Sequence, residues 1–173
     1  MNEEKKTPLP KIEGLEIRYT SSDDAEPLKQ WLQEPGVLSG FPMADLREIE
    51  DAVRHWISFS KYKSSLTATI HGEPCGIATL CLMPYRKLAH HCLISIIVSE
   101  TQRGKGVGTL LMNNVIHLAK TYFGIEVLYL EVYEGNRAVS LYHRFGFTEV
   151  GLQRYFMKED GGYVGKIIME RVL

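Results

Sequence analysis

Cysteine is scarce in this chain, and the cysteines present form no motif. The 173 residues include three, Cys75, Cys81 and Cys92, and there is no CxxC pair among them. An odd number without paired spacing argues against a disulfide framework and against a zinc site, and it fits a reducing cytosol. We therefore expect a cytoplasmic protein that binds no metal.

Long apolar runs and an excess of one charge are missing as well. The opening MNEEKKTPLP is polar and lacks the apolar core of a signal peptide, and no later run is long enough to cross a bilayer. Lys plus Arg number 20 and Asp plus Glu 21, so the formal net charge is -1. This near balance argues against nucleic acid and anionic membranes as general partners.

The chain has no internal repeat and no low-complexity tract, and its length suits one domain. We expect a single domain over residues 1–173, with residues 1–12 as a flexible tail. The period of the apolar residues predicts the order β-α-α-β-β-β-α-β-α-β-β, an α+β or mixed α/β domain. The predicted strands cover residues 15–19, 65–70, 75–83, 90–99, 127–133, 147–156 and 163–171, and the predicted helices begin near residues 22, 45, 107 and 136.

A glycine-rich stretch, RGKGVG at residues 103–108, separates a predicted strand from the helix after it. The first backbone N–H groups of a helix have no partner within it, and the helix dipole adds positive charge at the same end. Glycines leave those N–H groups open, and Arg103 and Lys105 add formal charge beside them. The pattern predicts a site for a diphosphate-like anion, although the glycine count alone fits a mobile turn equally well.

Two common nucleotide-binding motifs are absent at this point. The P-loop pattern GxxxxGK[ST] is missing, and the run reads G-K-G-V-G and not G-x-G-x-x-G. It also follows a predicted hairpin and does not open a βαβ unit, so we do not expect a Rossmann dehydrogenase. No serine lies in a G-x-S-x-G setting either. This absence favours a reaction by direct attack on the substrate over one that passes through a covalent enzyme intermediate.

Two motifs at a suitable separation resemble those of the GNAT superfamily of acetyl-CoA-dependent N-acetyltransferases. The first is R-x-x-G-x-G, supplied by Arg103, Gly106 and Gly108. The second, N-x-A-x-x-L-Y-x-x-x-G-F, follows a predicted strand and is supplied by Asn136, Ala138, Leu141, Tyr142, Gly146 and Phe147. The resemblance covers about residue 15 to the end. It implies a GNAT-like acyltransferase fold, a central and mostly antiparallel mixed sheet flanked by about four helices.

The resemblance implies acetyl-CoA as co-substrate and no metal. The phosphates would lie on the glycine-rich stretch, and the pantetheine arm would pair with the preceding strand as an extra strand would, through its backbone. Asn136 would cap the next helix and also contact the cofactor. The implied cofactor-binding residues are Ile96, Ile97, Val98, Arg103, Gly104, Lys105, Gly106, Val107, Gly108, Thr109 and Asn136.

The implied reaction needs an acceptor for the proton of the amine and a donor for the departing thiolate. Tyr142 matches the family's tyrosine and is the expected general acid, with a plain core tyrosine as the alternative. Glu131, inside the apolar strand VLYLEVY, is the candidate base and is expected to be buried with a raised pKa. Its alternative is a structural carboxylate bonded to a neighbouring strand or to the loop at Asn136. A backbone N–H near Ile97 would stabilise the oxyanion.

The residues and the resemblance together predict an N-acetyltransferase that moves acetyl from acetyl-CoA to a primary amine by direct attack. The acceptor is left open between a small-molecule amine and a peptide or protein amine, and a homodimer is compatible with the sequence. The alternative from another class is a non-catalytic acyl-CoA-binding sensor or partner module. A nucleotide-binding regulator, which would bind ATP or GTP as well as it binds coenzyme A, is a third hypothesis.

Overall fold

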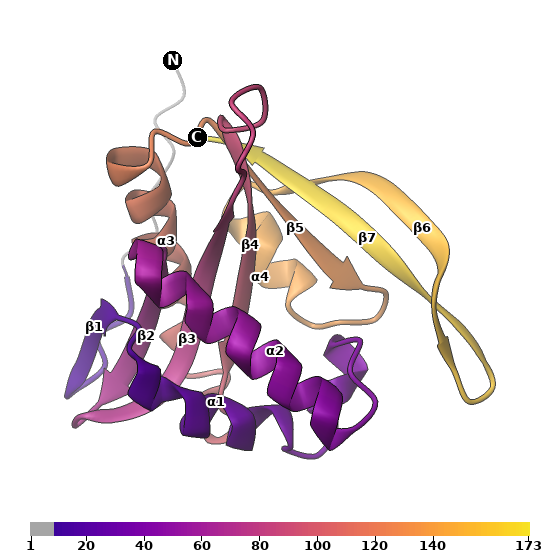
Figure 1. Cartoon of the computed structure of the whole chain (residues 1–173), viewed down its shortest axis with the longest axis horizontal. Helices are drawn as coiled ribbons and strands as arrows, with labels where there is room; N and C mark the ends of the chain where they lie inside the picture. Colours follow the sequence, from indigo (N-terminus) through magenta and orange to yellow (C-terminus); the bar gives the residue numbers. More distant parts are fainter. Residues whose placement is uncertain (1–8) are drawn as a thin grey trace.

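A computed structural model describes residues 9–173. Within these residues one seven-stranded sheet has the strand order β1-β2-β3-β4-β5-β7-β6 (Figure 1). The strands are β1 (Leu15–Tyr19), β2 (Ser65–Ile70), β3 (Glu73–Leu82), β4 (His91–Val98), β5 (Val127–Tyr133), β6 (Thr148–Glu159) and β7 (Gly162–Val172). The helices are α1 (Ala25–Leu32), α2 (Leu46–Ser58), α3 (Val107–Tyr122) and α4 (Val139–Arg144), with short 3-10 turns η1 (Ser22–Asp24), η2 (Val37–Gly40), η3 (Phe59–Tyr62) and η4 (Glu100–Gln102).

The predicted α+β class and the mostly antiparallel mixed sheet are confirmed. Neighbouring strands pair antiparallel, except for β4 and β5, which run parallel. The predicted order of helices and strands is the observed one as well. The last helix begins later than expected, at Val139, because the two residues after Asn136, Arg137 and Ala138, form a turn that precedes it.

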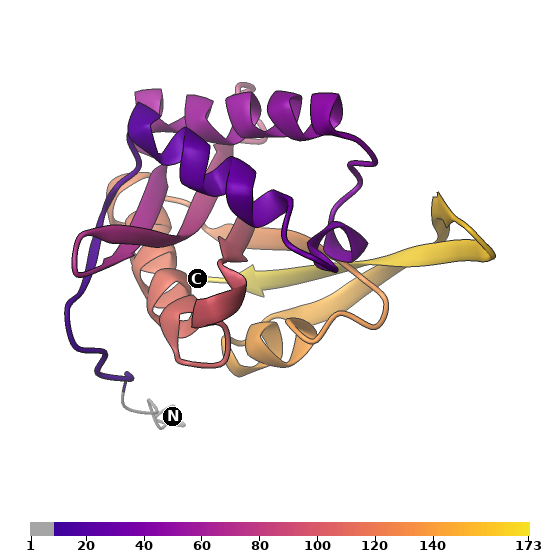
Figure 2. The same ribbon diagram turned by 90° about the horizontal axis from the view of Figure 1, so that it is seen from below.

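The helices form two layers, with α1 and α2 on one face of the sheet and α3 and α4 on the other (Figure 2). Helix α2 is amphipathic, and it buries Ile49, Val53 and Trp56 at helical spacing. Asp45 caps its first turn, because a carboxylate oxygen accepts from the N–H of Glu48 at 2.9 Å. The larger core lies on the α3 side, where Leu111 is fully buried with residues of β3, β4 and β5.

Strands β4 and β5 separate after a short parallel pairing. The paired residues are His91 with Val127, Cys92 with Leu128, and Leu93 with Tyr129. Beyond them β4 continues to Val98 and β5 to Tyr133 without further pairing between the two strands. We call the space between the edges of Ile94–Val98 and Leu130–Tyr133 the β4–β5 gap. The apolar pattern of each strand predicts its existence but not this divergence.

The start of the described chain differs from expectation, whereas its last two strands form the expected hairpin. Of the predicted tail, residues 1–8 lie outside the described residues, whereas Pro10 packs against the loop before α3, near Gly106. At the other end, β6 and β7 form a hairpin that extends past the helices (Figure 1). Their register shifts between Gln153 and Met157, so that three residues of β6 bulge opposite Gly165.

No helix within residues 9–173 is long and apolar enough to span a membrane. Across the same part of the chain, His, Cys, Asp and Glu side chains do not gather in any group of three or more that would hold a metal ion.

Candidate functional site

The β4–β5 gap exposes backbone groups of β4. The N–H of Ser99 donates to the carbonyl of Cys75 on β3 at 2.9 Å. Backbone groups of alternate residues point to the same neighbouring strand, so those of Ile97 also face β3. The backbone groups of Ile96 and Val98 therefore face the gap, where β5 no longer pairs with them.

The side chains of this segment belong to the core, as expected. Ile97 is 4% exposed and packs with the residues under α1 and α2. Ile96 and Val98 point to the opposite face and pack against the core under α3. Ile96 and Val98 are only partly buried, so this segment offers a ligand its gap-facing backbone together with part of these two side chains.

The glycine-rich loop reaches the start of α3 with open N–H groups. Gly104 and Gly106 have φ of 72° and 98°, in the left-handed region that glycine adopts most easily, and Gly106 is the residue before the helix. Within residues 9–173, no N–H from residue 104 to residue 109 makes a well-aligned hydrogen bond to a backbone or side-chain acceptor, although residues 103–106 form a turn. Six consecutive N–H groups at a helix start, free of acidic side chains in the first turn, form a site for an anion.

Arg103 is partly engaged by the protein itself. Its Nε donates to the carbonyl of Val98 at 2.9 Å, and its Nη2 lies 3.4 Å from Oε2 of Glu34. The same Glu34 oxygen accepts from the N–H of Glu100 at 2.9 Å. Lys105, in contrast, is exposed. The two cations that were predicted to flank the anion therefore differ, since Arg103 is held by contacts with Val98 and Glu34 whereas Lys105 makes no side-chain hydrogen bond or ion pair within residues 9–173.

Tyr142 is buried on α4, on the α3 side of the sheet. It is 8% exposed, and its ring meets Phe147 edge-on at a centroid distance of 6.2 Å. Burial raises the pKa of Tyr142 to about 12, because the phenolate would lose its hydration there. The phenol therefore keeps its proton at any physiological pH. No side-chain hydrogen bond within residues 9–173 involves its hydroxyl, and no fully buried side-chain oxygen there lacks a partner, so the hydroxyl oxygen keeps some exposed surface.

Asn136 shapes the loop between β5 and α4. Its Oδ1 accepts from the N–H of Ala138 at 2.9 Å, so it caps the turn that leads into α4. A Cβ built on Gly40 would lie 3.3 Å from Nδ2 of Asn136. The connection between α1 and α2 therefore closely approaches the loop after β5, at one end of the β4–β5 gap.

Glu131 is not the buried, isolated carboxylate that the sequence predicts. Its side chain is 38% exposed, and Oε2 lies 3.0 Å from Nζ of Lys166 on β7. The strand alternates, so that Leu130 and Val132 face the core while Glu131 faces the side of the sheet that carries α1 and α2. This contact with β7 is the one expected if Glu131 is a structural carboxylate bonded to a neighbouring strand.

Lys166 is a residue that the sequence did not single out. Its side chain is only 10% exposed, and Nζ lies 3.9 Å from the centroid of the Phe156 ring. Phe156 belongs to the β6 bulge, and its ring is 5.7 Å from that of Tyr133. The sequence signal that could have identified Lys166 is a lysine inside the strand GYVGKIIMERV. Its partners, Glu131 on β5 and Phe156 in the β6 bulge, meet it only in the folded chain.

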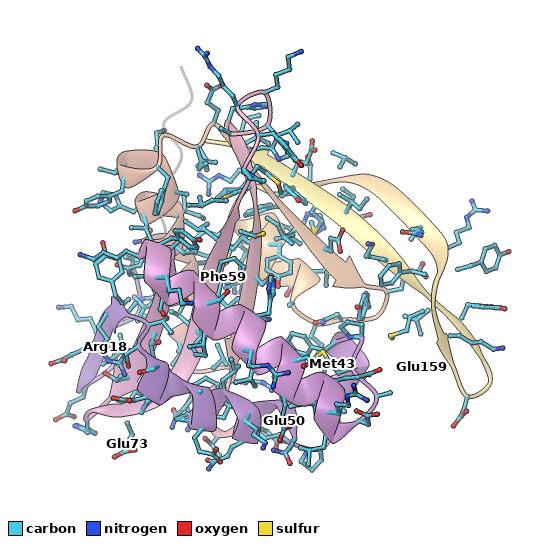
Figure 3. All side chains as sticks on the ribbon, viewed as in Figure 1. Arg18, Met43, Glu50, Phe59, Glu73 and Glu159 are labelled. Atoms are coloured by element: carbon cyan, nitrogen blue, oxygen red, sulfur yellow. The ribbon has the colours of Figure 1, made fainter. Side chains whose placement is uncertain are left out.

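This face of the sheet is unevenly covered. In Figure 1, α1 and α2 lie over β2, β3 and β4, whereas no helix lies over β5, β7 and β6. Figure 3 shows Met43 before the start of α2, and Glu159 at the far tip of the β6–β7 hairpin. Glu131, whose side chain is 38% exposed, therefore lies on a part of the sheet that no helix covers.

The comparisons with known proteins point one way. Residues 25–147 match the Acetyltransferase (GNAT) family. The [ribosomal protein bS18]-alanine N-acetyltransferase of Haemophilus influenzae is 37% identical over 78 residues, which are 44% of this chain and 53% of that protein. The L-amino acid N-acetyltransferase of Escherichia coli is 26% identical over 108 residues, which are 62% of this chain and 67% of that protein. The chain thus spans between half and two thirds of these relatives' lengths.

A solved structure gives a match over nearly the whole fold. The structure of yncA, a putative acetyltransferase from Salmonella typhimurium with its cofactor acetyl-CoA, covers 92% of this chain and 94% of its own, with a TM-score of 0.76. The sequence identity is 18%, so this match concerns the fold.

Proposed function

Since the chain belongs to the Acetyltransferase (GNAT) family, we propose that it transfers the acetyl group of acetyl-CoA to a primary amine. The observation that carries the proposal is the row of open N–H groups from residue 104 to residue 109, placed directly after the gap-facing edge of β4. An anionic diphosphate fits the first feature, and an extended chain with amide groups fits the second. Coenzyme A combines both.

The residues that would hold coenzyme A follow from this placement. The diphosphate would lie on the N–H groups of residues 104–109, with Lys105 beside it. The pantetheine arm would pair with the backbone of Ile96 and Val98, which faces the gap. Ile97 would support this edge through its buried side chain, and Asn136 would set the position of the loop across the gap.

The chemistry would then use groups on both sides of the sheet. Bond formation between the amine nitrogen and the acetyl carbon, with cleavage of the carbon–sulfur bond, releases one proton from nitrogen and requires one at sulfur. Glu131 would accept the first proton, directly or through water, and Tyr142 would donate the second. A gap-facing N–H of Ile96 or Val98, flanking Ile97, would stabilise the oxyanion.

The acceptor is proposed only as a class. The acceptors in the names of the two relatives are an alanine of a ribosomal protein and L-amino acids. Both can present an α-amino group, and no helix covers β5, β7 and β6 on the face of the sheet to which Glu131 belongs (Figure 1). The free thiols of Cys75, Cys81 and Cys92 support a reducing compartment such as the cytoplasm.

The experiment that tests the proposal is thiol release from acetyl-CoA with a panel of amino acids, peptides with free N-termini, polyamines and lysine derivatives. Turnover with at least one amine, together with the mass of the acetylated product, is the expected result. Coenzyme A binding without turnover across the panel would favour the non-catalytic sensor. Competition by ATP or GTP at the affinity of coenzyme A would favour the nucleotide-binding regulator.

A further inference from the structure

The connection between α1 and the cofactor loop involves a residue outside both sequence motifs. Glu34, just after α1, places a single oxygen within 2.9 Å of the N–H of Glu100 and 3.4 Å of Nη2 of Arg103. Its side chain is 21% exposed and that of Arg103 is 44% exposed. Helix α1 is thus joined to the loop that follows β4, although the residues lie far apart in the sequence.

Arg103 also occupies a backbone group that the proposed cofactor would use. Its Nε donates to the carbonyl of Val98 at 2.9 Å, and that carbonyl faces the β4–β5 gap. Val98 is the last residue of β4. An extended ligand that paired along the whole gap-facing edge would therefore compete with Arg103 for this acceptor.

We propose that Glu34 and Arg103 form a latch that holds the end of β4 in the cofactor-free protein. Glu34 keeps the guanidinium on Val98, and binding of the diphosphate draws Arg103 away to the anion. The inference rests on the proposed coenzyme A site. It assigns Glu34 as a positioning residue, because Glu34 acts on the cofactor only through Arg103.

The charge of Glu34 determines the direction in which its replacement should change the affinity for coenzyme A. The negative charge of the Glu34 carboxylate holds the guanidinium of Arg103, one of the two cations beside the anion site, on Val98. Replacing Glu34 with glutamine removes that charge but keeps an oxygen that can accept from the N–H of Glu100. A purely structural contact would weaken coenzyme A binding when lost, whereas the latch predicts that Glu34→Gln binds coenzyme A more tightly.

The test is a calorimetric binding series with coenzyme A on the full chain. Glu34→Gln is expected to bind about two- to five-fold more tightly than the parent chain, the range of an exposed ion pair. The gain should shrink when NaCl is raised from about 0.05 to about 0.5 M, because salt screens exposed charges. Glu26→Gln, which removes a carboxylate from the same helix without touching the loop, should change little.

A double-mutant cycle completes the test. In an Arg103→Ala background, Glu34→Gln should give no further gain, because its effect passes through the guanidinium. Unchanged or weaker binding by Glu34→Gln, or the same gain with and without Arg103, overturns the latch. Circular dichroism melting of each variant separates these outcomes from misfolding. If the parent chain binds no coenzyme A at all, the proposed function fails; if it binds and turns over without the gain, only the latch fails.

Discussion

At the scale of single residues, the two proposed proton carriers lie in opposite environments. Tyr142 is buried among apolar side chains, whereas Glu131 is partly exposed and paired with Lys166. The sequence motif correctly predicted that Tyr142 lies on a helix, because the motif residues on either side of it mark where that helix begins and ends. The environment predicted for Glu131 is wrong, because the apolar strand suggests burial on both faces, whereas Leu130 and Val132 face the core and Glu131 faces away from it.

Replacement of Tyr142 by phenylalanine tests its catalytic role. The variant keeps the buried ring and loses only the hydroxyl, so we expect kcat to fall about 100-fold while the affinity for coenzyme A stays within about twofold. Steady-state kinetics together with binding calorimetry give both values. Tyr122→Phe, at an exposed tyrosine on α3, is the matched control. Equal losses of kcat and affinity would make Tyr142 a structural residue.

Three buried ionisable side chains, one tyrosine and two cysteines, predict how the free energy of unfolding changes at alkaline pH. Burial raises the pKa of Tyr142 and Cys92 to about 12 and that of Cys75 to about 11. In the unfolded chain these groups ionise near their ordinary values of about 10 for tyrosine and 8.5 for cysteine. The unfolded state therefore binds fewer protons above those values, and the free energy of unfolding should fall as pH rises from about 8.5 toward 12.

Urea unfolding at a series of pH values measures this dependence. Each group should lower the free energy of unfolding by at most about 1.4 kcal/mol per pH unit, and only above its ordinary pKa. Cys92→Ala should reduce the slope between about pH 9 and 12, although it also lowers stability at neutral pH by leaving a cavity. A slope that is identical in the variant would show that Cys92 has the same pKa in the folded and unfolded chain.

At the scale of elements, the site depends on how strands and helices end. The anion site arises where β4 stops and α3 starts, and the glycines with positive φ allow the chain to turn there with its N–H groups outward. The sequence predicted this loop and its strand and helix well, because periodicity and helix signals are local. It did not predict the Glu34 contact or the bulge around Phe156, because these depend on segments that meet only in the folded chain.

The loop before α3 can be tested with one glycine. Gly106 has φ of 98°, and a Cβ there would come within 2.8 Å of the Pro10 side chain, so we expect Gly106→Ala to lose about 1–2 kcal/mol of stability. Distortion of the anion site should also weaken coenzyme A binding about tenfold, or about 1.4 kcal/mol. Chemical unfolding and calorimetry measure the two effects.

Gly124 provides the control for this variant. Its φ is 61°, and a Cβ there would meet no atom within 4 Å. Gly124→Ala should therefore cost stability through its backbone conformation alone and leave coenzyme A affinity unchanged. If both alanine variants bind coenzyme A as the parent chain does, the diphosphate lies elsewhere.

At the scale of the whole molecule, a short seam joins two parts of the sheet. Strands β1–β4 carry α1, α2 and α3, and β5 pairs along its whole length with β7. The parallel contact between the parts has three residue pairs. A ligand in the β4–β5 gap would contact both parts and should stabilise the folded chain against unfolding.

Coenzyme A should therefore raise the melting temperature. At about 100 times its dissociation constant a ligand that binds only the folded state adds about 2.7 kcal/mol, which corresponds to a rise of about 5–10 °C for a chain of this length. A thermal shift series over coenzyme A concentration measures it. An equal rise with ATP would contradict a site matched to coenzyme A, and Gly106→Ala should show a smaller rise than the parent chain.

The divergence of β4 and β5 has a further consequence for motion. Where the strands part, the peptide groups on the two edges no longer pair with each other, so slow opening of the sheet should begin along this line and not in its interior. Amide hydrogens of Ile96 and Val98 should then exchange with solvent much faster than that of Ile97, whose N–H points to β3. A ligand bound in the gap should remove that difference in exchange rate, so amide exchange at Ile96 and Val98 would report binding directly.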